Sequence, residues 1–142
     1  MLFSAHGLPE KSIKAGDPYQ VQVEQTARAI VEQLGEDVDW SVCYQSRVGP
    51  LKWIGPSTET EIHRAATDKK AIVLYPLSFV SEHSETLVEL DIDYRRLAAE
   101  AGVPAYIRVP TVGTHPKFIE SLTGRCTVAY ENPQAPTPCS RH

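Results

Sequence analysis

Four short apolar segments alternate with helical patterns along this chain of 142 residues, and this alternation constrains the fold more than any other feature. The strongest strand signal is "AIVLYPLS" at 71–78, which is apolar nearly throughout and is therefore predicted to be buried on both faces. Further strands are predicted at 2–5, at 40–46 and in "AYIRVP". Because strands that alternate with helices form parallel sheets, we expect an α/β fold of three layers, in which helices flank a four-stranded parallel sheet.

The segments between these strands carry the period of amphipathic helices. "PYQVQVEQTARAIVEQLG" places Val23 and Ala27 on one apolar stripe, and its final glycine is a stop signal. The next helix is predicted to run to about residue 66. Ser57 and Thr58 are its N-cap candidates, and Thr58 with Glu61 fits a capping box. A third helix is predicted over 84–102, and "HPKFIESLTG" is expected to form a last short helix.

Composition indicates one small domain without a nucleic-acid or membrane-spanning role. The net charge of −4 gives no basic footprint, and no apolar run approaches the ~18 residues that cross a bilayer. Three cysteines without a close pair argue against a disulfide framework, so we expect a cytoplasmic location, and a peripheral contact with a membrane surface is compatible with this composition. Residues 1–123 are expected to form the domain, and the Pro-rich tail at 124–142 is expected to be irregular.

Chemistry-bearing residues follow the predicted strands directly. His6 comes after the first strand, "QSRVGPLKW" after the second, "SFVSEHSE" after the third and "PTVGTH" after the fourth. Ligands of open α/β sheets bind beyond the carboxyl ends of the strands, so these turns are expected to line one cleft. Gly7 permits a sharp turn after His6, and Pro9 prevents the strand from continuing.

Three carboxylates recur every four residues in "SEHSETLVELDIDY". At this spacing Glu85, Glu89 and Asp93 share one face of a helix, where like charges repel. Because this row of carboxylates does not help the helix to fold, it is compatible with a role as a path for a hard cation or for protons.

Each of these features also has a plain structural interpretation. His6 alone is equally well explained as a core histidine that donates to a backbone carbonyl. The acidic row is also typical of a solvated helix face, and Trp53 of a packing anchor. His83 and His115 are alternatively capping or exposed residues. Cys126 and Cys139 stand without further ligands, so a metal site there is not expected.

Five stretches in a fixed order resemble one known family. They are "LFSAHGLP", "GDPY", "YQSRVGPLKWIGPST", "PLSFVSEHSETLVELDIDY" and "RVPTVGTHPKFIESL". From about residue 2 to residue 122 the chain is similar to the C-terminal half of the ferrochelatases, the protohaem ferro-lyases. The resemblance implies a Rossmann-like domain of the class II chelatase fold that takes part in inserting Fe²⁺ into protoporphyrin IX in haem biosynthesis.

The resemblance also implies roles for particular residues. His6 and Glu85 would be the catalytic residues and would hold the metal, with His6 acting either as base or as ligand. Glu89, Asp93 and His83 would line a metal or proton path, on a helix with a local widening. Trp53, Ser46 and Pro76 would contact the porphyrin. No tightly bound cofactor is expected, Fe²⁺ being a substrate, and no [2Fe–2S] cluster is expected, because the cysteines of the tail lack the family's spacing.

The chain is expected to lack the family's first domain, which forms the opposite wall of the porphyrin cleft. An excised domain, a truncated product and one piece of a split enzyme all fit this pattern. Two alternatives to the iron enzyme stay open: a non-catalytic half-domain that binds metal or a tetrapyrrole, and a chelatase for another porphyrin or metal. The partners implied are porphyrin, ferrous iron and the missing domain.

Overall fold

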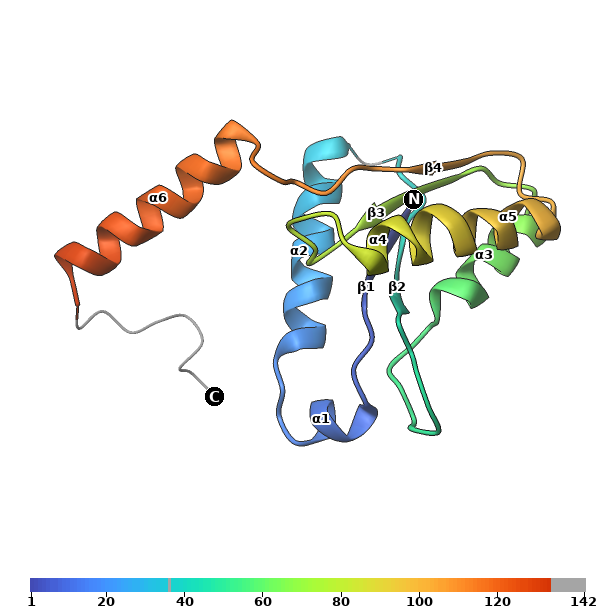
Figure 1. Cartoon of the computed structure of the whole chain (residues 1–142), viewed down its shortest axis with the longest axis horizontal. Helices are drawn as coiled ribbons and strands as arrows, with labels where there is room; N and C mark the ends of the chain where they lie inside the picture. Colours follow the sequence, from blue (N-terminus) through green and yellow to red (C-terminus); the bar gives the residue numbers. More distant parts are fainter. Residues whose placement is uncertain (36, 134–142) are drawn as a thin grey trace. The chain divides into compact units, whose positions relative to one another are not determined.

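The computed structural model describes residues 1–35 and 37–133 of the chain (Figure 1). Two compact units are distinguished, Met1–Thr111 and a second that begins at Val112. The elements of the first unit, in chain order, are β1 (Leu2–His6), α1 (Glu10–Lys14), α2 (Tyr19–Leu34), β2 (Ser41–Gln45), α3 (Thr58–Thr67), β3 (Ile72–Pro76), α4 (Ser84–Leu87), the π-helix η1 (Glu89–Asp93), α5 (Tyr94–Ala101) and β4 (Tyr106–Arg108). The second unit contains α6 (Pro116–Glu131).

The sheet is parallel throughout, with the strand order β2-β1-β3-β4. Ser4 at the centre of β1 lies opposite Cys43 of β2 and Pro76 of β3. The chain adds β2 on one side of β1 and β3 on the other. Since parallel crossovers are right-handed, the connecting helices must then lie on opposite faces of the sheet.

The core confirms this arrangement of three layers (Figure 1). On one face Val23 and Ala27 of α2 pack against Phe3 and Tyr44 of the sheet. On the other face, residues from α3, η1 and α5 pack against the inward side chains of β1, β2 and β3, and these helical residues are Ile62, Ala65, Leu90, Tyr94 and Ala98. The predicted fold class is therefore confirmed.

The prediction that the third strand is buried on both faces is wrong at one position. Val73 of β3 is 37% exposed, whereas its neighbours Ile72 and Leu74 are buried. The cluster around α2 covers β1 and β2 on this face and includes neither Val73 nor Ile107 of β4. Only one face of β3 is therefore buried along its whole length within the first unit.

The start of α3 differs from the predicted capping box. Of the two predicted candidates, Ser57 is confirmed as the N-cap, and its hydroxyl accepts a hydrogen bond from the Thr60 amide at 3.1 Å. The Thr58 hydroxyl points into the core instead and bonds to Ser4 Oγ at 2.8 Å. Glu61 pairs with an arginine of its own helix. Burial of Thr58 by the sheet removes it from the capping role that its sequence position indicates.

The predicted irregular tail from residue 124 is wrong for its first part. Helix α6 continues through Gly124 to Glu131, because an interior glycine costs a helix only about 1 kcal/mol and the next proline is Pro133. The remainder of the tail, 134–142, lies outside the described residues. Among the helices of the described ranges, none is both long and apolar enough to cross a bilayer.

Candidate functional site

The site lies where the chain connections of the sheet diverge. The loop after β1 leads to α2 on one face, and the loop after β3 leads to α4 on the other, which opens a crevice at the carboxyl ends of these two strands. His6 is the last residue of β1, and Glu85 lies in the first turn of α4. Their side chains face each other across the crevice, with 3.7 Å between His6 Nε2 and Glu85 Oε1.

Hydrogen bonds fix the orientation of the His6 ring. Its Nδ1 lies 2.7 Å from the carbonyl oxygen of Gly7, and since a carbonyl only accepts, Nδ1 carries the proton. Nε2 is therefore the atom turned toward Glu85. The hydroxyl of Tyr19 donates to the His6 carbonyl at 3.0 Å. The predicted alternative of a histidine bonded to a backbone carbonyl is confirmed, but the ring is 42% exposed and is not a core side chain.

The glycine after His6 is required by close packing. The Gly7 amide donates to the Gln45 carbonyl at 2.8 Å, which continues the β1–β2 pairing by one residue. A Cβ at Gly7 would lie 2.9 Å from Arg47 Cγ, 3.0 Å from that carbonyl oxygen and 3.4 Å from the Trp53 ring. Trp53 thus packs against the turn that carries His6, as the packing-anchor interpretation predicts.

Helix α4 begins with a reciprocal cap made by His83. The Nδ1 of His83 accepts from the Glu85 amide at 3.2 Å, and the His83 amide donates to the Thr86 hydroxyl at 3.0 Å. The capping interpretation of His83 is confirmed. The cap sets the first turn of α4, and with it the direction of Glu85.

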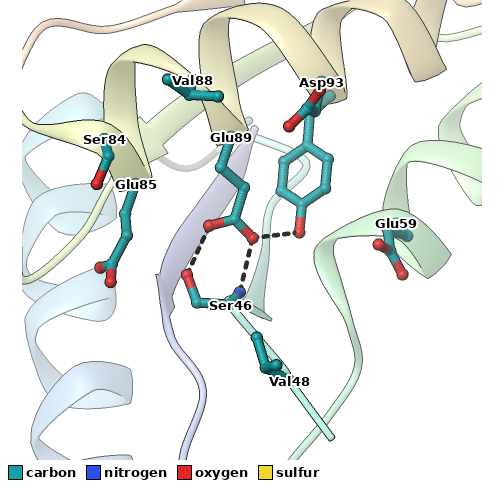
Figure 2. A pocket seen from close by; sticks show the side chains of 9 residues that line it. Ser46, Val48, Glu59, Ser84, Glu85, Val88, Glu89 and Asp93 are labelled. Carbon is teal, nitrogen blue, oxygen red and sulfur yellow. Dashed lines mark hydrogen bonds between the residues drawn. The ribbon is translucent and has the colours of Figure 1, made fainter.

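The acidic row lines one open cavity of about 460 Å³ (Figure 2). Glu85, Glu89 and Asp93 all contribute to its wall, as the four-residue spacing predicts. Figure 2 shows that Glu89 projects from the helix toward Ser46 and that Glu85 projects from the preceding turn of the helix. The row is therefore not simply a solvated helix face.

Glu89 differs from the other two acids because four donors hold its carboxylate. The Ser46 amide and hydroxyl bond to it at 2.7 and 2.5 Å (Figure 2). The Tyr94 hydroxyl bonds to it at 2.9 Å and the Gln45 side-chain amide at 3.1 Å. Ser46 has a φ of 57°, a left-handed conformation that aims both of its donors at the same carboxylate. Burial raises the pKa of Tyr94, and the Glu89 charge raises it further, so this hydroxyl stays a donor. Glu89 joins η1 to the end of β2.

A buried polar chain supports this arrangement from beneath. Gln45 is fully buried, accepts from Ser4 Oγ at 2.9 Å and donates to the Glu85 carbonyl at 2.8 Å. Ser4 continues the chain to Thr58, which bonds to the Cys43 sulfur at 3.4 Å. Burial raises the pKa of the Cys43 thiol to about 12, so it remains a neutral member of the core.

Several residues expected at the site, His6 among them, do not line the cavity of the acidic row. Pro76 is buried at the end of β3 and does not line the cavity. Trp53 is half-buried beside Gly7 and is not in the cavity wall, and its indole N–H has no hydrogen-bond partner within the described residues. His115 is the exposed N-cap of α6 in the second unit.

Sequence reasoning missed four residues that shape the site. Glu59 and Tyr94 line the cavity, Gln45 holds α4, and Tyr19 holds His6. Tyr94 follows Glu89 by five residues, and the π-turn η1 brings these two positions together. No sequence pattern near Glu59 predicts its place in the cavity wall, because tertiary packing of α3 against the sheet brings it there.

The described residues bring few metal donors together. In residues 1–35 and 37–133, no group of three or more histidine, cysteine, aspartate or glutamate side chains is arranged to hold a metal. His6 and Glu85 are spaced so that one ion, about 2.1 Å from each donor atom, would bridge them. Further ligands would have to come from a substrate or from water.

A solved structure shares this fold. It is that of a putative cobalamin (vitamin B12) biosynthesis CbiX protein from Marinobacter aquaeolei VT8, which is 20% identical, with a TM-score of 0.58 over 94% of this chain and 97% of that one. The domain therefore has the class II chelatase fold. The ferrochelatase family model matches residues 1–129, and the chain belongs to the ferrochelatase family.

Curated relatives agree with this assignment over most of the chain. The ferrochelatase of Caulobacter vibrioides (strain NA1000 / CB15N) is 61% identical over 122 residues, which are 86% of this chain and 35% of that protein. The ferrochelatase of Pelagibacter ubique (strain HTCC1062) is 60% identical over 124 residues, which are 87% of this chain and 36% of that protein. The chain thus spans about a third of the length of the relatives it matches.

Proposed function

We propose that this chain forms the metal-site half of a ferrochelatase that inserts Fe²⁺ into protoporphyrin IX in haem biosynthesis. The observation that carries the proposal is the pairing of His6 with Glu85 at the carboxyl ends of β1 and β3. The chain that holds this pair belongs to the ferrochelatase family. Fe²⁺ is a substrate here, and His6 and Glu85 act on it directly.

The two side chains supply complementary chemistry. Metalation removes two pyrrole protons, and a neutral imidazole has a suitable pKa for accepting one. His6 offers Nε2 for this purpose, since Nδ1 is committed to the Gly7 carbonyl. Glu85 offers a carboxylate oxygen, and oxygen with imidazole donors hold a divalent first-row ion less firmly than thiolates do.

The acidic row extends the site away from this pair. Asp93 is half exposed at the far side of the cavity wall and is the entry point in this proposal. Glu89 passes an ion or proton only if it gives up some of its four donors. His83 contributes only through Nε2, because its Nδ1 caps α4.

The rim of the cavity suits an apolar macrocycle. Val48 and Val88 line it, and they are 78% and 47% exposed. Leu51 and Leu87, on the segments that carry these valines, are 58% and 48% exposed. Large apolar side chains gathered on a surface mark a binding face, and a volume of about 460 Å³ falls within the ~300–1,000 Å³ of small-molecule sites. Of the residues expected to contact porphyrin, Ser46 is the one in this wall.

We further propose that sequence outside this chain supplies the opposite wall of the site, in line with the greater length of the relatives. A cytoplasmic location with peripheral membrane contact, and the absence of an iron–sulfur cluster, stay predictions.

The second candidate function is a half-domain that binds metal or porphyrin without turnover. It is favoured by the presence of only two suitably placed metal donors in the described part of the chain.

The test is anaerobic metalation of protoporphyrin IX with Fe²⁺, followed by absorbance of the macrocycle. The chain is compared with His6→Ala and Glu85→Gln, and with two controls at exposed positions outside the cavity wall, His63→Ala on α3 and Glu100→Gln on α5. Turnover that both site variants lose and both controls keep supports the enzyme. Saturable binding without turnover, dependent on Glu85, supports the binding half-domain. Absence of both, or equal loss in the controls, overturns the proposal.

A further inference from the structure

A buried arginine of the edge strand β4 contacts the acidic segment at two places. The Arg108 side chain is 9% exposed, and its Nε and Nη2 donate to Asp91 Oδ1 and Oδ2 at 2.9 and 2.5 Å. Its Nη1 donates to Glu82 Oε1 at 2.6 Å. Asp91 is the middle residue of η1, and Glu82 directly precedes the cap of α4. One guanidinium therefore joins the beginning of this segment to its widened turn.

Neighbouring backbone contacts strengthen the same junction. The Thr111 amide donates to Glu82 Oε1 at 2.9 Å, and the Tyr106 hydroxyl donates to the Leu90 carbonyl at 2.9 Å. Tyr106 and Arg108 are two residues apart in β4 and so project to the same face. The strand β4 thus holds the segment on one side, while the Glu89 contacts hold it to β2 on the other.

The segment departs from a regular helix at its widened turn. Helix α4 continues through Val88 and the π-turn η1 into α5, so 84–101 form one helical run that the π-turn interrupts. π-turns are rare in helices and occur often at functional sites. The His83 cap sets the start of this run, and tertiary contacts at Glu82 and Asp91 hold the run on either side of Glu85.

We propose that Arg108 is a positioning residue, which holds Glu82 and Asp91 together and thereby fixes α4 and η1 so that Glu85 faces His6. The inference rests on the proposed function for the use made of Glu85, while the ordering of the segment is a property of this chain alone. Arginine suits this role because its planar fork serves both carboxylates at once. A lysine keeps the charge but reaches only one of the two carboxylates with good geometry. The other carboxylate then loses its partner and is repelled by the first.

Arg64 on α3 offers a matched control. Arg64 of α3 bonds to Glu61 through Nε at 2.9 Å and through Nη2 at 2.8 Å, and it lies 3.4 Å from Asp68. Glu61 belongs to α3, and Asp68 is the C-cap of the same helix. Arg64→Lys therefore removes a similar network without touching α4 or η1.

The first test is amide hydrogen exchange on the full chain, compared for Arg108→Lys and Arg64→Lys. We expect Arg108→Lys to speed exchange over 84–93 by about tenfold and to leave β1 and β2 unchanged, since local openings report local contacts. Arg64→Lys should leave exchange over 84–93 as it was. Unchanged exchange over 84–93 in Arg108→Lys, or an equal increase in Arg64→Lys, overturns the proposal.

The second test uses Co²⁺ alone as a probe, titrated by its visible absorption. We expect Arg108→Lys to weaken Co²⁺ binding about fivefold to tenfold, Asp91→Asn to do the same, and the double variant to be no worse than either, because coupled residues are not additive. If the unaltered chain shows no Co²⁺ binding dependent on His6 and Glu85, the proposed function fails, and the exchange result still decides the role of Arg108. If that binding occurs and Arg108→Lys matches the unaltered chain, the role of Arg108 is refuted.

Discussion

His6 Nε2 lies 3.7 Å from Glu85 Oε1, although one residue ends the first strand and the other begins the helix after the third. Backbone contacts hold both members of the pair. Tyr19 bonds to the His6 carbonyl, and Gln45 bonds to the Glu85 carbonyl. The pair is therefore built before any substrate arrives, which is the condition for directing chemistry by position.

The turn at Gly7 should not tolerate a side chain. Gly7→Ala would place a methyl group 3.0 Å from the Gln45 carbonyl oxygen, which belongs to backbone and cannot move aside. We expect a loss of about 1–3 kcal/mol in the free energy of unfolding, measured by urea denaturation. Gly124→Ala in α6 meets nothing within 4 Å and should not lower stability. Equal stability of both variants would contradict this account of the turn.

The Tyr94 hydroxyl should contribute to stability, and the Tyr44 hydroxyl should not. Tyr94→Phe removes a hydrogen bond to the Glu89 carboxylate, worth about 1.5–3 kcal/mol in free energy of unfolding. The Tyr44 hydroxyl is buried without a partner in the described part of the chain, so Tyr44→Phe should be neutral or stabilising. Denaturation of both variants measures the contrast, and a larger loss in Tyr44→Phe would refute it.

The two described cysteines should react at very different rates. Burial raises the pKa of Cys43 to about 12, so the thiol is protonated near neutral pH and inaccessible, whereas Cys126 is exposed. Iodoacetamide at pH 8 should modify Cys126 in the native chain and Cys43 only after unfolding. Peptide mapping by mass spectrometry separates the sites, and labelling of native Cys43 as fast as Cys126 would exclude its burial.

Stability should fall in acid through Glu82. Burial raises the pKa of Glu82, but the hydrogen bonds from the Thr111 amide and Arg108, together with the Arg108 charge, outweigh this and lower it from 4.5 to about 2. Ionised Glu82 therefore stabilises the fold above pH 4.5 and loses this contribution as the pH falls toward 2. Because about a third of the Glu82 side chain is exposed and solvent screens its charge, we expect only about 1 kcal/mol.

Glu82→Gln is the variant that measures this contribution. Its deficit in free energy of unfolding relative to the unaltered chain should be full at pH 6 and should shrink as the pH approaches 2. Urea denaturation of both proteins across this range gives the difference directly. A deficit that stays constant with pH would show that the charge of Glu82 contributes nothing.

The sequence by itself determined the order of elements and the edge at which the site lies. Apolar runs such as 71–78 and the stripe of Val23 and Ala27 are local patterns, and burial of such patterns leaves few alternatives to a parallel sheet with helices on both faces. The place of His6 at a strand end follows from the same patterns. The spacing of the three acids also put them correctly on one cavity wall.

The tertiary structure alone decided which of these residues meet. Thr58 turns into the core instead of capping α3, Pro76 is buried by the sheet, and His83 caps α4, because packing competes with each local preference. The π-turn joins Tyr94 to Glu89, a contact that an α-helical spacing would not make.

The pairing of His6 with Glu85 depends on strand order as well as on pattern. Because β2 and β3 lie on opposite sides of β1, the connections that follow β1 and β3 run over opposite faces of the sheet. A ligand crevice is expected between the starts of these two connections. A linear sequence encodes the residues on both sides of that crevice. Their separation is set by long-range hydrogen bonds between segments distant along the chain, such as the bond from Gln45 to the Glu85 carbonyl.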